Sequence, residues 1–324
     1  MSEAQHGLPQ DPQDVTQVPE ETPPPPRLFT PPQNGEVITY NNVNYYLGNF
    51  IGKGSFGGVY ECTDDWGNEL VAKVLLPLNR SYEEVKEEWL KELQKLAYLR
   101  HPAITFVHSA FEYRDTFYLI LERCSSTLYD LINMPDLLPD VWIPYVSRDV
   151  LQAVHFIHSG GYVHKDIHPG NVFMLWLKDR MNPAVSVLQF KVGDLGISNL
   201  ESDIDIFNTI LADWMLPPEA IDPTEFGIVG KQVDVYHTGL LLLSLLLKGV
   251  PTFTKDEIVA GKPRQVAESL SSPYALPIAK TLRRHVAYRT QTAIDFWKDI
   301  ATAFFSSQAQ SRPQTSDSGT ALLS

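Results

Sequence analysis

The chain has 324 residues, of which 44% are hydrophobic and 20% are charged, and this composition is typical of a globular protein with room for two packed units. Its 26 Lys and Arg residues against 39 Asp and Glu give a net charge of −13, which argues against nucleic acid as a partner. The leucine-rich run from Gly239 to Leu247 is shorter than the roughly 20 apolar residues of a membrane span, so we expect no membrane insertion. The amino terminus lacks the basic start and apolar stretch of a secretory signal, and the sequence has only two cysteines, Cys62 and Cys124; both features favour a reducing cytoplasm.

Residues 1–36 are dominated by Gln, Glu, Asp and Pro and include the run Pro23 to Pro26. Such a composition buries too little apolar surface to offset the entropy lost on ordering, so we predict a disordered tail. The tail is interpreted as a spacer, and the alternative is a Pro-rich segment that binds an SH3- or WW-like partner.

The first folded elements are two apolar strand patterns, at Leu47–Ile51 and Val59–Cys62, joined by a glycine-rich stretch. That stretch reads Gly52, Lys53, Gly54, Ser55, Phe56, Gly57, Gly58 and Val59. Glycines let backbone amides approach phosphate oxygens, although glycines between two strands also describe an ordinary hairpin.

A third strand, Leu70–Lys73, comes next, followed by a predicted helix over Tyr82–Arg100. Val85, Trp89, Leu93 and Leu96 recur at helical spacing within it. A further apolar strand, Phe117–Leu121, leads to Glu122, Arg123 and Cys124, and the remainder is mostly helical in period. We therefore predict an α+β protein with a β-rich lobe at 37–121, a hinge at 122–124, a helical lobe at 125–313, and a tail at 314–324 that either stays loose or forms a short last helix.

The stretch from His164 to Asn171 carries the most specific chemistry, because it places Asp166 and Asn171 five residues apart ahead of a strand-like run. A carboxylate can orient a hydroxyl nucleophile, and a carboxamide oxygen can hold a divalent ion on a triphosphate. Asp194, Leu195 and Gly196 follow another short apolar strand. An isolated sequence of this kind would indicate only a turn.

Taken in order, these segments resemble the motifs of eukaryotic-type protein kinases, in a divergent serine/threonine-like form. The set includes the glycine loop (Gly52 to Val59), the strand that ends in Lys73, the catalytic loop (His164 to Asn171) and the turn at Asp194. Pro217-Pro218-Glu219 and the stretch from Asp234 to Gly239 resemble two further kinase motifs. The resemblance implies a two-lobed fold, a protein substrate, ATP, and Mg²⁺ or in its place Mn²⁺.

The resemblance also implies roles for single residues. Lys73 would bind the α- and β-phosphates and pair with Glu92, although Glu87 and Glu88 lie nearby and could compete. Asp166 would orient the acceptor hydroxyl, while Asn171 and Asp194 would be the metal ligands. The remaining ATP contacts would come from the glycine-loop residues and from Ile51, Val71, Leu121, Glu122, Cys124 and Phe173. Glu219 would form a structural ion pair with Arg312, and Asp234 would brace the catalytic-loop backbone.

Three departures from the kinase pattern concern the acceptor side of the site. His168 stands where serine/threonine kinases carry a catalytic lysine, and a neutral imidazole offers one hydrogen bond whereas a protonated one would restore the charge. Lys165 replaces an arginine, and Ala212 stands where threonine is usual. Because neither His168 nor Gly170 is the arginine of tyrosine kinases, we predict serine/threonine specificity. The alternative to an active enzyme is a pseudokinase that acts as a nucleotide-binding or scaffolding module.

One basic cluster remains outside these motifs: Lys280, Arg283, Arg284, His285 and Arg289. We interpret it as a solvated helical face, and the alternative is a surface that docks an acidic substrate or an anionic partner.

Overall fold

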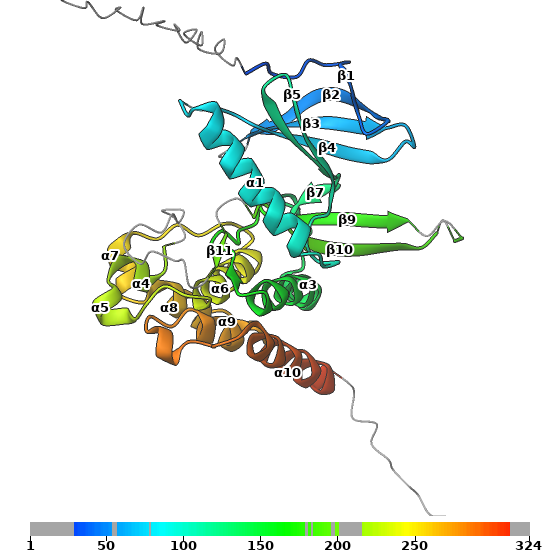
Figure 1. The fold of residues 1–324 in the computed structure, drawn as a ribbon. Coiled ribbons are helices and arrows are strands. Elements are labelled where there is room, and N and C mark those ends of the chain that lie inside the picture. Colours follow the sequence, from blue (N-terminus) through cyan, green and yellow to red (C-terminus); the bar gives the residue numbers. More distant parts are fainter. Residues whose placement is uncertain are drawn as a thin grey trace, which may run out of the picture.

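The computed structural model describes residues 29–53, 57–77, 79–178, 181–182, 184–195, 198–200 and 216–311. Within them a small lobe built on an antiparallel sheet joins a larger helical lobe, so the predicted α+β two-lobed fold is confirmed (Figure 1). The tail up to residue 28, including Pro23 to Pro26, and the segment after residue 311 lie outside the described residues. Residues 29–36, which we expected to belong to the disordered tail, contact the small lobe: Phe29 packs against its core, and the Thr30 amide donates to Thr116 Oγ1 at 3.2 Å.

The small lobe is a six-stranded sheet with the order β1-β2-β3-β4-β6-β5. Its strands are β1 (Val37–Tyr40), β2 (Val43–Lys53), β3 (Gly57–Asp64), β4 (Glu69–Leu75), β5 (Val107–Tyr113) and β6 (Thr116–Glu122). The central strands are apolar on both faces, and Ala72, Val74 and Leu119 are fully buried. A Cβ on Gly57 would lie 2.5 Å from the Val74 carbonyl oxygen, so the close approach of β3 to β4 at this point requires glycine.

Helix α1 (Tyr82–Tyr98) packs on this sheet through the apolar positions that the sequence spaces at helical intervals. Val85, Trp89 and Leu96 are buried, and Trp89 Nε1 donates to the Tyr118 carbonyl at 3.1 Å. Ser81 caps the first turn in a reciprocal capping box with Glu84, an arrangement whose loss typically costs about 1 kcal/mol. The same buried face carries Glu92.

The large lobe is mainly helical. Its helices are α2 (Leu128–Ile132), α3 (Pro139–Ser159), α4 (Pro218–Ile221), α5 (Pro223–Phe226), α6 (Gln232–Leu247), α7 (Lys255–Val259), α8 (Lys262–Glu268), α9 (Ala275–Thr281), the 3-10 helix η3 (Val286–Tyr288) and α10 (Ala293–Ser311). Helix α6 is buried from Val233 to Leu245, so the leucine-rich run forms a central core helix. Among the described residues, no helix is long and apolar enough to cross a membrane.

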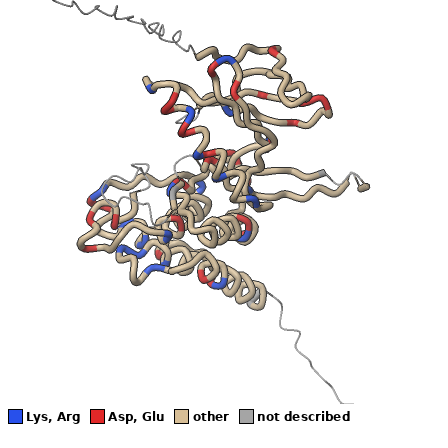
Figure 2. Tube along the Cα trace, in the orientation of Figure 1, with Lys and Arg blue, Asp and Glu red and all other residues tan. Residues whose placement is uncertain are grey.

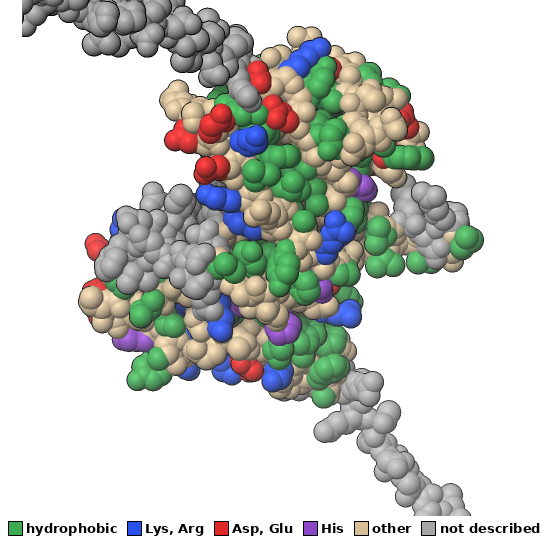
Figure 3. Space-filling model, in the orientation of Figure 1, with side chains coloured by type: hydrophobic (Ala, Val, Ile, Leu, Met, Phe, Trp, Pro, Cys, Tyr) green, Lys and Arg blue, Asp and Glu red, His purple; other side chains and the backbone are tan. Residues whose placement is uncertain are grey.

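Short strands complete the large lobe: β7 (Ser126–Thr127), β8 (Tyr162–Val163), β9 (Val172–Lys178), β10 (Ser186–Val192) and β11 (Asn199–Leu200). β9 and β10 form an antiparallel hairpin whose far end projects from the body and carries exposed apolar side chains (Figures 1 and 3). At its base Val172 pairs with Val192, and the Gly193 amide donates to the Asn171 carbonyl at 2.9 Å. The hairpin therefore brings the end of the catalytic loop next to Asp194.

Candidate active site

A cavity of 590 Å³ lies between the two lobes, lined by the end of β2, by β3, β4, α1 and β6, by the hinge, and by the base of the β9–β10 hairpin. Most of the sequence-predicted ATP contacts line it: Ile51, Gly52, Lys53, Gly57, Val59, Val71, Lys73, Leu121, Glu122, Cys124 and Phe173. Gly58 is buried in β3 and does not line it, whereas Gly54, Ser55 and Phe56 lie outside the described residues. Leu96 and Thr105 also line the cavity, and nothing in their local sequence pattern indicated this.

Lys73 joins the two lobes electrostatically. Its Nζ lies 2.7 Å from Glu92 Oε1 and 3.0 Å from Asp194 Oδ1, and the lysine is 7% exposed. Burial alone would lower the pKa of Lys73, but the two carboxylates outweigh it and raise the pKa above its ordinary value. Glu92 is thus confirmed as the partner within α1, because Glu88 pairs with Arg80 and Glu87 lies beside Lys91.

Asn171 and Asp194, the predicted metal ligands, line the same cavity. Asn171 Nδ2 donates to the carbonyl and to Oδ2 of Asp166, both at 3.0 Å, while its amide oxygen accepts no hydrogen bond from a described residue. The described residues contain no cluster of three or more His, Cys, Asp or Glu that could hold a metal ion. Asn171 and Asp194 each bring an oxygen to one cavity, and they would suit Mg²⁺, which favours one or two protein oxygen ligands and fills its shell with phosphate oxygens and water.

Asp234 of α6 binds the backbone of the catalytic loop, as the resemblance implied. Asp234 Oδ2 accepts from the His164 amide at 2.8 Å, and Oδ1 accepts from the Lys165 amide at 2.7 Å. His158 Nε2 lies 2.8 Å from the same carboxylate. Burial would raise the pKa of Asp234, but the hydrogen bond from His158 and the positive groups around it lower the pKa, so the group is ionised at neutral pH. These bonds hold Lys165 at φ +70°, a conformation that a side-chain-bearing residue rarely adopts.

His168 lies beside Asp166, with Nε2 3.7 Å from Asp166 Oδ1. The Gly170 amide donates to His168 Nδ1 at 3.0 Å, so Nδ1 is the unprotonated nitrogen. Burial lowers the pKa of His168 despite the neighbouring Asp166 carboxylate. The geometry therefore favours the neutral imidazole over the protonated one, with its single proton on Nε2.

The hinge contains an ion pair that sequence reasoning missed. Glu122 accepts from Lys191 Nζ at 2.7 and 2.9 Å and from the Phe106 amide at 2.7 Å. Lys191 is a buried lysine at the apolar end of strand β10, between Phe190 and Val192, and this placement was the signal in the sequence. The Glu122 carboxylate is therefore occupied by protein groups, which leaves the hinge backbone to face a ligand.

Among the hinge amides, the N–H of Glu122 donates to the Phe106 carbonyl and that of Arg123 to the Glu69 carbonyl. The Cys124 amide donates to no acceptor in the described part of the chain. Burial raises the pKa of the Cys124 thiol to about 12, so the side chain is a neutral thiol at physiological pH.

The predicted ion pair between Glu219 and Arg312 is wrong. Glu219, at the start of α4, is fully buried and forms a bidentate pair with Arg289, with Nη1–Oε1 at 2.6 Å and Nη2–Oε2 at 2.7 Å. Arg312 lies outside the described residues, as does Ala212. A buried carboxylate needs a cation at bonding distance, and the chain between α9 and α10 folds Arg289 inward to supply it.

The interpretation of the basic cluster as a solvated helical face is also wrong, because most of its residues lie beyond the end of a helix and one of them is buried. Helix α9 ends at Thr281, so Arg283, Arg284 and His285 lie on the connection to η3, and Arg289 is 2% exposed.

Comparison with known proteins agrees with this geometry. A family model described as protein kinase domain matches residues 45–316. The chain is 26% identical over 77% of its length to the cell cycle serine/threonine-protein kinase CDC5/MSD2 of Saccharomyces cerevisiae, and 28% identical over 69% to calcium-dependent protein kinase 21 of Arabidopsis thaliana. It is 27% identical over 65% to the serine/threonine-protein kinase TAO3 of Xenopus laevis. The matches span 34%, 42% and 22% of these relatives, each of which is a longer protein. The chain belongs to the protein kinase domain family.

Proposed function

We propose that this protein transfers the γ-phosphate of ATP to a serine or threonine hydroxyl of a protein substrate. The observation that carries the proposal is the contact of Lys73 with both Glu92 and Asp194, made inside the cavity that Asn171 also lines. This arrangement places one cation and two candidate metal-binding oxygens on the wall where a triphosphate would lie.

The adenine of ATP would occupy the apolar part of the cavity, between Ile51, Val59 and Val71 on the small lobe and Phe173 on the large lobe. Leu121 narrows the back of that space, and the Cys124 amide is the hinge donor left to hydrogen-bond a base. Divalent metal, when bound through Asn171 and Asp194, would neutralise phosphate charge.

Asp166 would orient the acceptor hydroxyl and receive its proton. Its carboxylate is already positioned by Asn171 Nδ2 and belongs to a loop that Asp234 braces. Little conformational entropy therefore remains to be lost when the reaction occurs. His168, neutral and with its Nε2 proton facing the same carboxylate, would offer a hydrogen bond in place of the missing lysine's charge.

Serine or threonine as the acceptor rests on the absence of the tyrosine-kinase arginine at His168 and Gly170, and on the names of two of the relatives, the yeast and Xenopus kinases. A cytoplasmic location and a partner for the Pro-rich tail stay predictions from the sequence.

The proposal is tested by replacing Asp166 with Asn and measuring turnover and ATP affinity separately. Loss of the proton acceptor should lower kcat by at least about 100-fold, while ATP binding, which depends on Lys73 and the hinge, should be nearly unchanged. Lys73→Met should instead weaken ATP binding. If Asp166→Asn keeps wild-type turnover, the assignment of Asp166 fails.

A further inference from the structure

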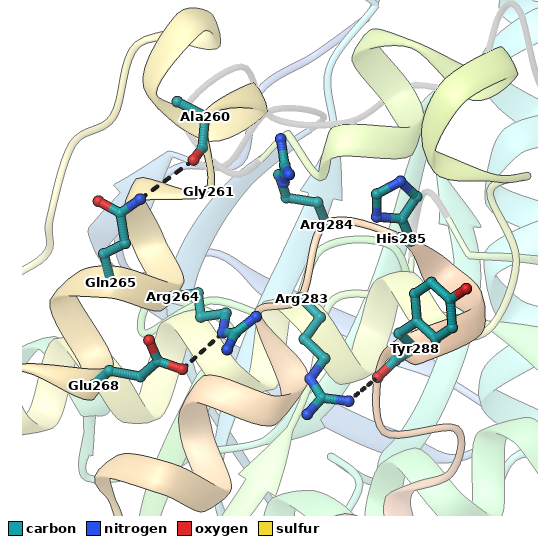
Figure 4. Close-up of a pocket in the computed structure, with 9 residues that line it drawn as sticks. All are labelled: Ala260, Gly261, Arg264, Gln265, Glu268, Arg283, Arg284, His285 and Tyr288. Carbon is teal, nitrogen blue, oxygen red and sulfur yellow. Dashed lines mark hydrogen bonds and ion pairs between the residues drawn. The ribbon is translucent and has the colours of Figure 1, made fainter.

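A second hollow, of 460 Å³, lies in the large lobe and shares no lining residue with the interlobe cavity. One wall is the start and exposed face of α8, and the other is the connection from α9 to η3 (Figure 4). Arg264 projects from α8, while Arg283, Arg284 and His285 come from the connection. The hollow thus gathers three arginines and a histidine against one carboxylate, that of Glu268.

This concentration of positive charge contrasts with the protein as a whole, whose net charge is −13. Figure 2 shows Lys and Arg gathered in the part of the large lobe around α8 and α9, while Asp and Glu recur along α1 and the small lobe. An anionic ligand that approaches the molecule would be attracted to this hollow and repelled by much of the remaining surface.

Arg284 is held in place by its surroundings. Its Nη1 donates to the Val259 carbonyl at the end of α7 at 2.9 Å, and its guanidinium lies over the Phe226 ring at 5.8 Å. Gly261 has φ +80°, and a Cβ there would lie 3.3 Å from Arg284 Cδ, so the glycine leaves room for the arginine stem to pack on the backbone. A side chain fixed in this way loses little entropy when a ligand binds it.

Arg283 is held similarly, with Nη1 donating to the Tyr288 carbonyl at 2.8 Å. Within the described ranges, neither Arg283 nor Arg284 forms an ion pair with a carboxylate, and each guanidinium has five N–H donors. Arg264 contacts Glu268 at 2.7 Å, but the two side chains are 44% and 38% exposed, so that pair is weak and exchangeable.

An adjoining hollow in the same lobe differs because its lysines are paired with carboxylates. It shares Arg283 and Tyr288 with the first, but its two lysines are paired, Lys280 with Asp299 at 3.0 Å and Lys298 with Asp295 at 3.4 Å. In the first hollow neither Arg283 nor Arg284 is paired with a carboxylate within the described residues, which makes it the stronger anion site.

We propose that the hollow lined by Arg264, Arg283, Arg284 and His285 docks an acidic segment of a protein substrate, through aspartate, glutamate or phosphorylated side chains. Arginine guanidinium groups bind carboxylate and phosphate oxygens in a bidentate manner. Tyr288, which is 68% exposed at the rim, adds an apolar contact for the peptide backbone and neighbouring side chains. That the bound protein is a substrate rests on the proposed kinase activity, whereas the binding of an acidic peptide does not depend on that activity.

The test is a fluorescence anisotropy titration of the full chain with three dye-labelled peptides: one rich in Asp and Glu, the same peptide with phosphoserine, and a neutral version containing Asn and Gln. The acidic peptides should bind saturably, more weakly at high salt, and the neutral peptide should not. The Arg264→Gln/Arg283→Gln double variant should weaken binding roughly tenfold. Lys262→Gln, on α8 but outside the hollow, is the matched control and should bind like wild type.

Steady-state kinetics test whether the hollow contributes to phosphoryl transfer. A substrate that carries the acidic segment should show a raised KM and an unchanged kcat in the double variant, while a short substrate without the segment should be unaffected. If the double variant misfolds by circular dichroism, Arg264→Gln alone repeats the test, because that side chain is exposed.

Equal binding of acidic and neutral peptides, or equal affinity of wild type and folded variant, would overturn the proposal. Binding of phosphatidylserine vesicles in place of the peptides would also overturn it, in favour of a membrane surface. If the protein transfers no phosphate but binds the acidic peptides through these arginines, the proposed activity fails and the docking site stands.

Discussion

Replacing Arg289 with methionine should destabilise the large lobe more than almost any other single change at a charged residue. All five N–H donors of this guanidinium are used. Two reach the Glu219 carboxylate, and the others reach the carbonyls of Arg283, Arg284 and Gln232 at 3.1 to 3.3 Å. Both side chains of the pair are fully buried, so water cannot take the place of either partner.

The expected cost follows from what Arg289→Met leaves behind. A buried carboxylate without its cation typically costs about 3–5 kcal/mol, and the three carbonyls lose their donors as well. For a unit of this size, such a loss corresponds to a fall in Tm of roughly 10 °C. Arg289→Lys should be nearly as damaging, because an ammonium group cannot reproduce the planar two-point contact.

Urea unfolding followed by circular dichroism measures the effect, with Arg312→Met as the control. The control should change the free energy of unfolding by less than about 0.5 kcal/mol, because both Glu219 oxygens are already bound by Arg289. The Glu219→Met/Arg289→Met double variant should be more stable than Arg289→Met alone, because no unpaired charge remains buried. A large loss in Arg312→Met together with a small one in Arg289→Met would refute the pairing seen here.

The remaining predictions concern titratable groups near the site. Because burial lowers the pKa of His168 and Nδ1 accepts from the Gly170 amide, the imidazole should stay neutral, and turnover flat, above the ordinary histidine pKa of about 6.5. Turnover should fall only at lower pH, where protonation breaks that hydrogen bond, and His168→Gln should remove this acid limb from the kcat–pH profile. A profile that instead rises on acidification would favour the protonated form. Burial also lowers the pKa of Lys95 to about 8, while its Nζ donates to the Leu195 carbonyl at 3.2 Å. Between about pH 8 and 10.4 the unfolded chain therefore binds more protons than the folded one. The free energy of unfolding of wild type relative to Lys95→Met should rise with pH across that window. Thermal melts that show no such pH dependence would contradict the burial of Lys95.

The sequence predicted the contacts whose partners lie in strongly patterned segments. Lys73 and Glu92 were matched through the resemblance to protein kinases, and the packing of α1 agrees with that choice because Glu92 shares its buried face with Trp89 and Leu96. The bracing of the catalytic loop by Asp234 also came from the resemblance, and it agrees with the rule that a buried carboxylate must find polar partners.

The missed contacts depend on irregular backbone. Arg289 lies between α9 and α10, where no periodicity indicates which cation turns inward, and the resemblance to protein kinases had pointed to Arg312 instead. Lys191 reaches Glu122 only because the β9–β10 hairpin lies beneath the hinge, a long-range placement that local pattern does not contain. Phe29 was assigned to the tail by composition, although a single aromatic residue is enough to attach a polar segment to an exposed core edge.

The most direct test of the proposed activity is transfer of labelled γ-phosphate from ATP, with Mg²⁺ or Mn²⁺, to the protein itself and to generic acidic and basic proteins. Asp166→Asn serves as the control, and phosphoamino-acid analysis identifies the acceptor. The account predicts label on serine or threonine that disappears in the control. Intact ATP binding without transfer under either metal would contradict it and would favour a nucleotide-binding scaffold.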